Sequence, residues 1–214
     1  METLPAIPGA LLKWLARPAD EVAPGLLGAH LLRTTAEGAV GVRITEVEAY
    51  LGESDPGSHA FRGQTNRNRA MFGPAGHIYV YFTYGMHHCV NIVCGHAGIA
   101  TGVLIRAGEV SHGRELAYRR RTSAKNDTEL ARGPGRLAQA LGLTLADNGR
   151  AFIPGELELR LPATSAPAAH VRSGPRVGVS GEGGTDSYPW RFWLEGERTV
   201  SPYRAAKPRR RSAG

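Results

Sequence analysis

The sequence predicts a single α+β domain, with an antiparallel, curved β-sheet at its centre and short helices around it. Its 214 residues suit one well-buried core. Strand-like segments come in neighbouring pairs joined by short turns, which is typical of antiparallel hairpins. We assign residues 1–203 to this domain. Residues 204–214 are basic and lack large apolar side chains, so we expect them to form a disordered tail.

The chain begins with two predicted helices and two predicted strands. Residues 10–17 carry leucines and a tryptophan on one helical side and end before Pro18. Residues 22–27 predict a second short helix. Residues 30–35 and 40–49 predict two strands around a Glu-Gly turn, so they pair as a hairpin.

The second of these strands carries two carboxylates. The two-residue period of a strand puts Ile44, Glu46 and Glu48 on the same face. Glu48 comes just before a polar loop, which is the position of a catalytic base that activates water. The alternative for either glutamate is a charge at a strand end in solvent.

A loop and a short helix follow. Residues 51–63 are rich in Gly, Ser and Asp, which predicts a loop that carries His59. Residues 66–71 predict a helix of one or two turns, with Arg67 and Arg69 near its start. A phosphate would suit that end of the helix.

The next segment predicts a β-hairpin rich in tyrosine. Residues 78–84 and 87–93 are its two strands, joined by a two-residue turn. Tyr79 and Tyr81 share one face of the first strand, and Tyr84 lies at the tip. The plain alternative for these residues is ordinary aromatic packing at the edge of a core.

The second half of the chain alternates between short elements and Gly- or Pro-containing loops. The elements predicted here are a strand at 102–105, a helix at 111–121, a helix at 133–143, and strands at 157–161, 176–179 and 190–194.

The charge of the chain favours a polyanionic partner. The formal net charge is +7 and the pI is near 9.8. Lysine occurs only at positions 13, 125 and 207, so the basic side chains are almost all arginine, which grips phosphates bidentately and stacks on bases. We therefore expect nucleic acid as the partner, with an acidic membrane surface as the second choice.

Two cysteines, five residues apart, are too few for a disulfide framework. No apolar run reaches about 18 residues and no signal-type cleavage pattern follows the N-terminus, so we expect no membrane span and an intracellular location. The histidines and cysteines at positions 87, 88, 89, 94 and 96 alternate between strand faces and contain no CxxC pair, so no metal site is predicted.

Arginine and aromatic residues occur together in residues 43–95, which suggests a pocket for a nucleic-acid base. Tyr50, Tyr81 and His59 would stack on a base turned out of a duplex. Tyr84 at the hairpin tip would act as the wedge that fills the gap in the duplex.

Several motifs resemble those of the alkyladenine (3-methyladenine) DNA glycosylases, in the family's order and over nearly all of residues 33–194. The motifs are EVEAYLG at 46–52, His59, RGQTNRNRAMF at 62–72, YVYFTYGM at 79–86, CVNI at 89–92, VLIRA at 103–107, GPGRLAQAL at 133–141 and RVGV at 176–179. The resemblance implies an α+β fold with a β-hairpin that inserts into DNA.

The resemblance also implies roles for individual residues. Glu48 corresponds to the general base, and Arg106 and the main-chain carbonyl of Val177 correspond to the groups that help hold the attacking water. The base-binding positions are Tyr50, His59, Tyr79, Tyr81 and Asn91, where Asn91 disfavours the amine of normal guanine. The DNA-binding positions are Tyr84, Met86, Arg67 and Arg69.

The implied activity is hydrolysis of alkylated or deaminated purines from double-stranded DNA by a monomer, without a metal or cofactor. No lysine lies near the predicted site, so an abasic site is the expected product. The expected location is the bacterial cytoplasm, associated with the nucleoid, or the nucleus if the source is eukaryotic. The first rival is a metal-dependent nuclease using Glu46, Glu48, Asp55 and His59, and the second is a non-catalytic nucleic-acid-binding module.

Overall fold

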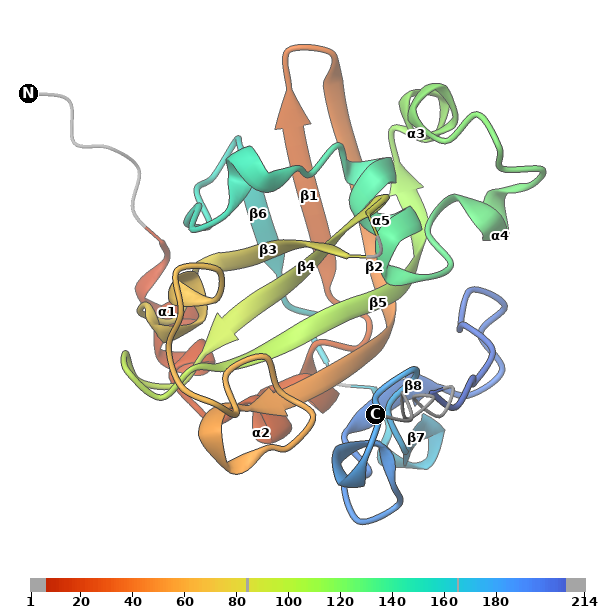
Figure 1. Ribbon diagram of the computed structural model, residues 1–214. Coiled ribbons are helices and arrows are strands. Elements are labelled where there is room, and N and C mark those ends of the chain that lie inside the picture. The colour runs from red at the N-terminus through yellow and green to blue at the C-terminus, as the bar shows by residue number, and fades with distance from the viewer. Residues whose placement is uncertain (1–6, 84, 165, 207–214) are drawn as a thin grey trace, which may run out of the picture.

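The structure, a computed structural model, describes residues 7–83, 85–164 and 166–206 (Figure 1). One antiparallel sheet forms its centre, with eight strands among the described residues. Short helices lie around this sheet, so the predicted α+β fold is confirmed. The strands are β1 His30–Thr35, β2 Gly38–Leu51, β3 Ile78–Thr83, β4 His87–Cys94, β5 Thr101–His112, β6 Leu157–Arg160, β7 Val171–Gly174 and β8 Arg191–Leu194.

The strand order is β3-β4-β5-β2-β1-β6, while β8 pairs with β2 and β7 pairs with β8. β2 has 14 residues and changes neighbours along its length. Its first half pairs with β1 as far as Arg43, and residues 46–48 pair with β8. The register between β2 and β5 shifts on both sides of Glu46. Such bulges bend a strand and re-aim its side chains, so the two carboxylates lie where the sheet is most irregular.

The helices are short and are bounded by proline and glycine. α5 has Pro134 in its first turn, where no amide hydrogen is needed, and ends at Gly142, whose φ of 69° is left-handed. The α-helices are α1 Gly9–Leu15, α2 Ala19–Gly25, α3 Arg114–Arg120, α4 Asp127–Leu130 and α5 Pro134–Leu141. The 3-10 helices are η1 Gly52–Ser54, η2 Arg69–Phe72, η3 Leu145–Asp147, η4 Ala168–His170 and η5 Glu182–Gly184. In the described part of the chain, no helix is long and apolar enough to cross a membrane.

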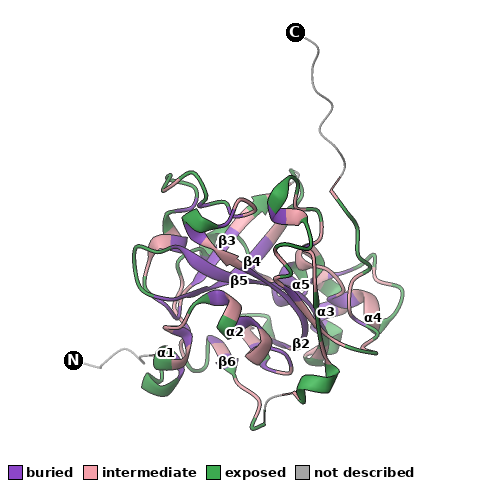
Figure 2. Cartoon of the chain, turned by 90° about the horizontal axis from the view of Figure 1, so that it is seen from below, coloured by how far each residue is buried: buried purple, intermediate pink, exposed green. Residues whose placement is uncertain are grey.

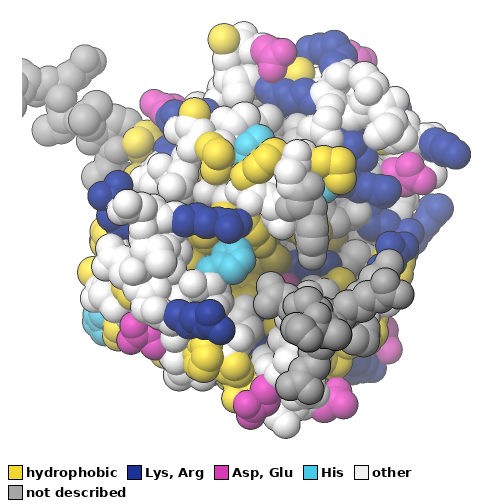
Figure 3. Space-filling model, viewed as in Figure 1, with side chains coloured by type: hydrophobic (Ala, Val, Ile, Leu, Met, Phe, Trp, Pro, Cys, Tyr) yellow, Lys and Arg dark blue, Asp and Glu magenta, His cyan; other side chains and the backbone are white. Residues whose placement is uncertain are grey.

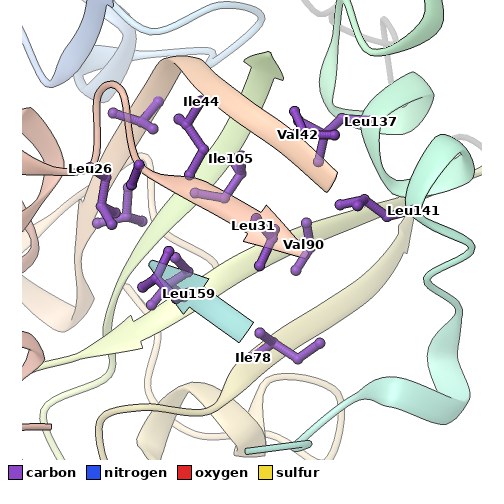
Figure 4. Packing of buried hydrophobic residues seen from close by; sticks show 14 of the residues in the cluster. Leu26, Leu31, Val42, Ile44, Ile78, Val90, Ile105, Leu137, Leu141 and Leu159 are labelled. Carbon is purple, nitrogen blue, oxygen red and sulfur yellow. The ribbon is translucent and has the colours of Figure 1, made fainter. Parts of the chain in front are cut away.

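The core is formed where the helices cover the sheet. Buried residues concentrate along the central strands, and the exposed ones lie at the periphery (Figure 2). Each fully buried leucine or isoleucine contributes about 1.5–3 kcal/mol relative to an exposed one. Figure 4 shows part of this cluster, with Leu26, Leu31, Val42, Ile44, Ile78, Val90, Ile105, Leu137, Leu141 and Leu159 labelled.

Most predicted elements are found, but three differ. The helix predicted at 66–71 is the 3-10 helix η2, which begins only at Arg69 and leaves Arg67 in the turn before it. The strand predicted at 102–105 continues to His112, because it pairs with β2 as far as Gly41, and the helix begins only after Gly113, whose φ is 70°. The strand predicted at 176–179 is wrong. That segment is a turn containing Gly178 at a φ of 71°, and the strand lies just before it, as β7.

Part of the predicted tail lies within the described structure. The carbonyl of Arg204 accepts a hydrogen bond of 2.9 Å from the amide of Gly178. Residues 205 and 206 line the same cavity as Arg204. The remainder of the predicted disordered tail, 207–214, lies outside the described residues.

Candidate active site

A cavity of about 1160 Å³ opens beside the hairpin β3–β4. It is lined by the end of β2, the loop that carries His59, the hairpin, residues 177–180 and the start of α5. Figure 3 shows the face of the molecule seen in Figure 1, where Lys, Arg and His side chains border a hollow with hydrophobic side chains in it. The predicted catalytic and base-binding residues therefore come together from segments that are far apart in the chain.

Glu48 lines this cavity, and its side chain is completely buried. Its Oε1 accepts the amide hydrogen of Val177 at 2.7 Å and lies 3.2 Å from Nη1 of Arg106. Its Oε2 accepts the hydroxyl hydrogen of Tyr50 at 2.8 Å. A carboxylate has about four lone-pair positions, so Glu48 keeps the capacity to accept a further hydrogen from a water molecule.

The structure thus brings Glu48, Arg106 and Val177 together, as the sequence predicts. The contact between Val177 and Glu48 is made by the amide of Val177, whereas the resemblance implies a role for its carbonyl. The alternative that Glu48 is a strand-end charge in solvent is wrong, because its side chain is buried among three donors.

Glu46 is also completely buried, in a network of its own. Its Oε1 accepts from Nε of Arg106 at 2.9 Å and from Nε of Arg191 at 2.7 Å. The amide and hydroxyl of Ser201 donate to the two oxygens at 2.6 and 2.9 Å. Burial opposes the charged form, but the two guanidinium groups hold the pKa of Glu46 below its ordinary value. Since Arg106 contacts both glutamates, this network also fixes its position beside Glu48.

Arg176 supports the site from behind. Its guanidinium is fully buried and forms a bidentate pair with Asp55 at 2.6 and 2.7 Å. It lies 4.5 Å from the ring centre of Tyr50 and 5.2 Å from that of Trp190, and donates to the carbonyl of Ala49. Burial disfavours the guanidinium, but the Asp55 carboxylate raises the pKa of Arg176 above its ordinary value. This residue therefore ties the aromatic wall to the turn that donates to Glu48.

Aromatic rings line the part of the cavity nearest Glu48. His59 and Tyr81 meet edge to face with ring centres 4.6 Å apart, and Tyr81 stacks on Tyr79 at 5.4 Å. Burial, and next the neighbouring carboxylate of Glu48, raise the pKa of Tyr50 well above its ordinary value. Burial also lowers the pKa of His59, as does nearby Arg67. The tyrosine hydroxyls therefore stay protonated and the imidazole is favoured in its neutral form.

Buried amides fix two of the predicted base-binding positions. The side-chain nitrogen of Asn91 donates to the carbonyl of Tyr79 at 3.2 Å. Asn68, which is 2% exposed, donates to the carbonyl of His59 at 2.9 Å and so holds the loop in place. The alternative of edge packing fits Tyr79 in part, because its side chain is 1% exposed and belongs to a small buried cluster.

Three of the predicted DNA-binding residues, Met86, Arg67 and Arg69, lie around the hairpin and do not line the cavity. Met86 is 70% exposed in the turn. Arg67 donates to the carbonyl of Phe82 on β3 at 3.0 Å, and Arg69 is exposed in η2. Tyr84 lies outside the described residues.

The carboxylates that a nuclease would use do not form a metal site in the structure. Glu46 and Asp55 are each bound to arginine side chains. Among residues 7–83, 85–164 and 166–206, no group of three or more His, Cys, Asp or Glu side chains is arranged to hold a metal ion.

Sequence reasoning missed three members of the site: Arg176, Arg191 and Ser201. The available signal for Arg176 was an arginine directly before Val177, in a segment otherwise apolar enough to resemble a strand. For Ser201 no local signal exists, because its contacts with Glu46 join residues 155 positions apart.

A buried carboxylate in an aromatic cavity, on a basic protein, is the kind of site with which a hydrolase cleaves the bond between a base and its sugar, that is, a DNA glycosylase. The model of the methylpurine-DNA glycosylase (MPG) family matches residues 13–198. The chain belongs to this family, which confirms the resemblance stated above.

Three bacterial relatives illustrate the similarity, and each is assigned as a 3-methyladenine DNA glycosylase. The protein from Streptomyces avermitilis is 59% identical over 93% of both chains. The protein from Leifsonia xyli is 54% identical over 86% of this chain and 87% of its own. The protein from Nocardia farcinica is 50% identical over 84% of both chains.

Proposed function

We propose that this chain is a monofunctional DNA glycosylase, which turns an alkylated or deaminated purine out of double-stranded DNA and hydrolyses its N-glycosidic bond. The products are the free base and an abasic site. The observation that supports this most directly is the Glu48 carboxylate, which is buried and held by three donors in an aromatic cavity.

Glu48 acts as the general base. As the bond between base and sugar breaks, positive charge develops on the sugar, and a nearby carboxylate stabilises it. The same carboxylate takes a proton from water, whose oxygen forms the new bond to the anomeric carbon while the base leaves with the bonding electrons. Arg106 and the carbonyl of Val177 help to hold that water.

The aromatic rings hold the base. Tyr50 stacks on one side of the purine and His59 with Tyr81 on the other, supported by Tyr79. An alkylated purine is positively charged, so contact with an electron-rich tyrosine ring contributes about 0.5–2 kcal/mol. The backbone of His59 reads the base edge, and the hydrogen bond from Asn68 to its carbonyl holds this part of the loop in place. Asn91 disfavours the exocyclic amine of normal guanine.

The hairpin inserts into the duplex. Tyr84 fills the gap left by the extruded base, with Met86 beside it. Arg67 and Arg69 neutralise backbone phosphates near the hairpin. The protein acts as a monomer at the bacterial nucleoid and needs no metal or cofactor.

The reaction stops at the abasic site. A glycosylase that also cuts the strand needs an amine nucleophile near the sugar. Lys13 lies in α1 and Lys125 lies before α4, and no lysine is among the described residues that line the cavity. Borohydride should therefore trap no covalent complex with damaged DNA, and a trapped complex would show that the reaction goes further.

The experiment that tests the proposal measures release of free base from duplexes that contain 3-methyladenine, 7-methylguanine, hypoxanthine or ethenoadenine, with a chelator present. We expect release from at least one duplex, and its loss in Glu48→Gln with DNA binding kept. No release from any of the four would overturn the proposal. Chelator-sensitive strand cleavage would instead point to a nuclease, and an unaffected Glu48→Gln variant to a binding module.

A further inference from the structure

Among the residues that the structure describes, Arg121 is a buried cation that forms no ion pair with a carboxylate. It is the C-cap residue of α3 and is 7% exposed. Other buried arginines of this protein, Arg106, Arg176 and Arg191, each bind a glutamate or aspartate. Within the described ranges, Arg121 donates hydrogen bonds only to neutral oxygens, through Nε and Nη1, and no hydrogen bond of its Nη2 is found.

The hydrogen bonds of Arg121 hold its guanidinium in a fixed direction. Nε donates to the carbonyl of Leu130 at 3.3 Å, and Nη1 donates to Oε1 of Gln139 at 2.9 Å and to the hydroxyl of Ser123 at 3.3 Å. Gln139 is itself oriented, since its Nε2 donates to the carbonyl of Arg120 at 2.7 Å. The side chain is therefore positioned at the cavity wall rather than free to reach a distant partner.

A second cation and the start of α5 lie in the same part of the cavity. Arg136, in the first turn of α5, is exposed and lines the cavity together with Arg121 and Ser123. The amides of Gly135 and Arg136 belong to the first helical turn, where no carbonyl within the helix is available to them. We call the group formed by Arg121, Ser123, Arg136 and these two amides the anion lobe.

The two positive charges of the anion lobe, those of Arg121 and Arg136, repel each other. Burial, and next the charge of Arg136, lower the pKa of Arg121 below its ordinary value, so the guanidinium is held at a cost. The described lining residues include the arginines 106, 121, 132, 136 and 204, but Glu48 is the one carboxylate. Glu48 is already bound to Arg106, and the charge of Glu129 raises the pKa of Arg121 by less than burial and Arg136 lower it. Among the described residues, no carboxylate forms an ion pair with the anion lobe.

The anion lobe lies beside the hairpin and in the same cavity as the proposed base site. A Cβ atom at Gly135 would lie 2.9 Å from Cβ of His87, the first residue of β4, so α5 packs directly against the hairpin next to its turn. Glu48 and Tyr50 line the same cavity of about 1160 Å³, which offers more room than one purine base fills.

We propose that the anion lobe binds one phosphodiester group of the DNA strand that carries the extruded nucleotide, adjacent to that nucleotide. A phosphodiester has two charged oxygens, which suit a guanidinium and helix-start amides together. The group lies next to the hairpin, where the strand must leave the duplex. This inference rests on the proposed function for the identity of the strand, and it makes Arg121 a positioning residue for the nucleotide.

The test is a double-mutant cycle between Arg121 and single phosphates. The DNA is a duplex with a stable abasic analogue, in which each phosphate on either side of the analogue is replaced in turn by an uncharged methylphosphonate. At one position, we expect the replacement to weaken binding to the wild-type protein by about tenfold. Arg121→Gln should weaken binding to the unmodified duplex by a similar factor. The methylphosphonate at that one position should then cause no further loss of affinity in Arg121→Gln. Losses that multiply at every position would overturn the inference.

Two further variants separate this effect from misfolding and from general charge. Arg136→Gln changes an exposed side chain, so it should fold normally and show the same coupling to the same phosphate. Arg119→Gln, the matched control, removes an exposed arginine of α3 that is not among the cavity residues described. Arg119→Gln should show no coupling to any single phosphate, and coupling equal to that of Arg121 would overturn the inference. The slope of log Kd against log salt should fall by about one for Arg121→Gln.

The outcome for the inference can be told apart from the outcome for the proposed function. Binding to the abasic analogue needs no catalysis. If the wild-type protein releases no base but shows the coupling, the proposed function is rejected and the phosphate site is supported. If the protein releases base but shows no coupling, the proposed function is supported and the phosphate site is rejected. Inorganic phosphate is the third probe: it should compete with unmodified duplex more weakly in Arg121→Gln than in wild type at matched ionic strength.

Discussion

Two glutamates on one strand, Glu46 and Glu48, have the same burial and very different surroundings. Glu46 accepts four hydrogen bonds from Arg106, Arg191 and Ser201, and it does not line the cavity among the described residues. Glu48 has three donors around it and faces the cavity. Glu46 thus accepts as many hydrogen bonds as a carboxylate has lone-pair positions, whereas Glu48 has one such position left for water.

The two glutamates differ in their expected roles, since Glu46 stabilises the fold around the site and Glu48 is the proposed base. Arg106 contacts both carboxylates, so Glu46 helps to hold the guanidinium that lies beside Glu48. Substitution of Glu46 should therefore lower mainly the free energy of unfolding, and substitution of Glu48 should lower mainly the rate of base release. The following predictions test that division.

Glu48→Gln should give the largest effect on activity. Gln cannot take a proton from water, and loss of a general base lowers a rate by about 10²–10⁴-fold. Single-turnover release of base measures this, with binding to an abasic-analogue duplex as the control that should stay within a few-fold. A rate within a factor of ten of wild type would show that Glu48 is not the base.

Glu46→Gln should give the largest effect on stability. It leaves two buried guanidinium groups with less counter-charge, which costs about 3 kcal/mol or more in the free energy of unfolding. Urea unfolding measures this. The matched control is Glu158→Gln, which removes the partner of Arg160 at the surface and should cost less than about 1 kcal/mol. Equal losses in the free energy of unfolding for the two variants would show that the buried ion pairs of Glu46 stabilise the fold no more than a surface pair does.

Tyr50→Phe should have an intermediate effect. It keeps the ring but removes the hydroxyl that donates to Oε2 of Glu48 at 2.8 Å. A hydrogen bond to a charged group contributes about 1.5–3 kcal/mol, so we expect release of base to slow by about tenfold or more. Tyr188→Phe, whose hydroxyl makes a 3.4 Å contact with Glu182 at the surface, is the control and should leave the rate unchanged.

The smallest effect is a dependence of stability on acid. The folded pKa of Glu46 lies below its ordinary value of 4.5, so its stabilising contribution is complete above that value and is lost as the pH falls through the lowered pKa. Wild type and Glu46→Gln should thus differ most in free energy of unfolding near pH 6, and the difference should narrow below about pH 4.5. A difference that stays constant into acid would contradict the assigned direction.

Local patterns were sufficient for the fold class and for the regions of most strands. The alternation in β2 and the tyrosine-rich hairpin are local features, and a strand that pairs with its neighbour in the chain is readily predicted. The turn at 176–179 was mistaken for a strand because Arg176, Val177 and Val179 have strand-like side chains. What decides that segment is a long-range ion pair between Arg176 and Asp55, which no local pattern reveals.

The burial of the two glutamates could not be predicted for the same reason. Apart from Tyr50, their partners lie 58 to 155 positions away along the chain, at Arg106, Val177, Arg191 and Ser201. Base rates for single residues favour a solvent-exposed glutamate, and only the folded sheet brings the donors to it. The resemblance supplied Arg106 and Val177, but Ser201 and Arg191 came from the structure alone.

The contacts of Ser201 have a consequence for the order in which the molecule becomes competent during synthesis. Glu46 and Glu48 belong to the first quarter of the chain, yet Ser201 completes the network of Glu46 only when nearly all described residues have been made. A nascent chain that ends before residue 177 lacks the amide that holds Glu48. Unfinished chains therefore lack contacts that hold the two glutamates. A cut between β8 and Ser201 should abolish activity in the finished protein, because it separates Ser201 and the cavity-lining residues 204–206 from the rest of the site.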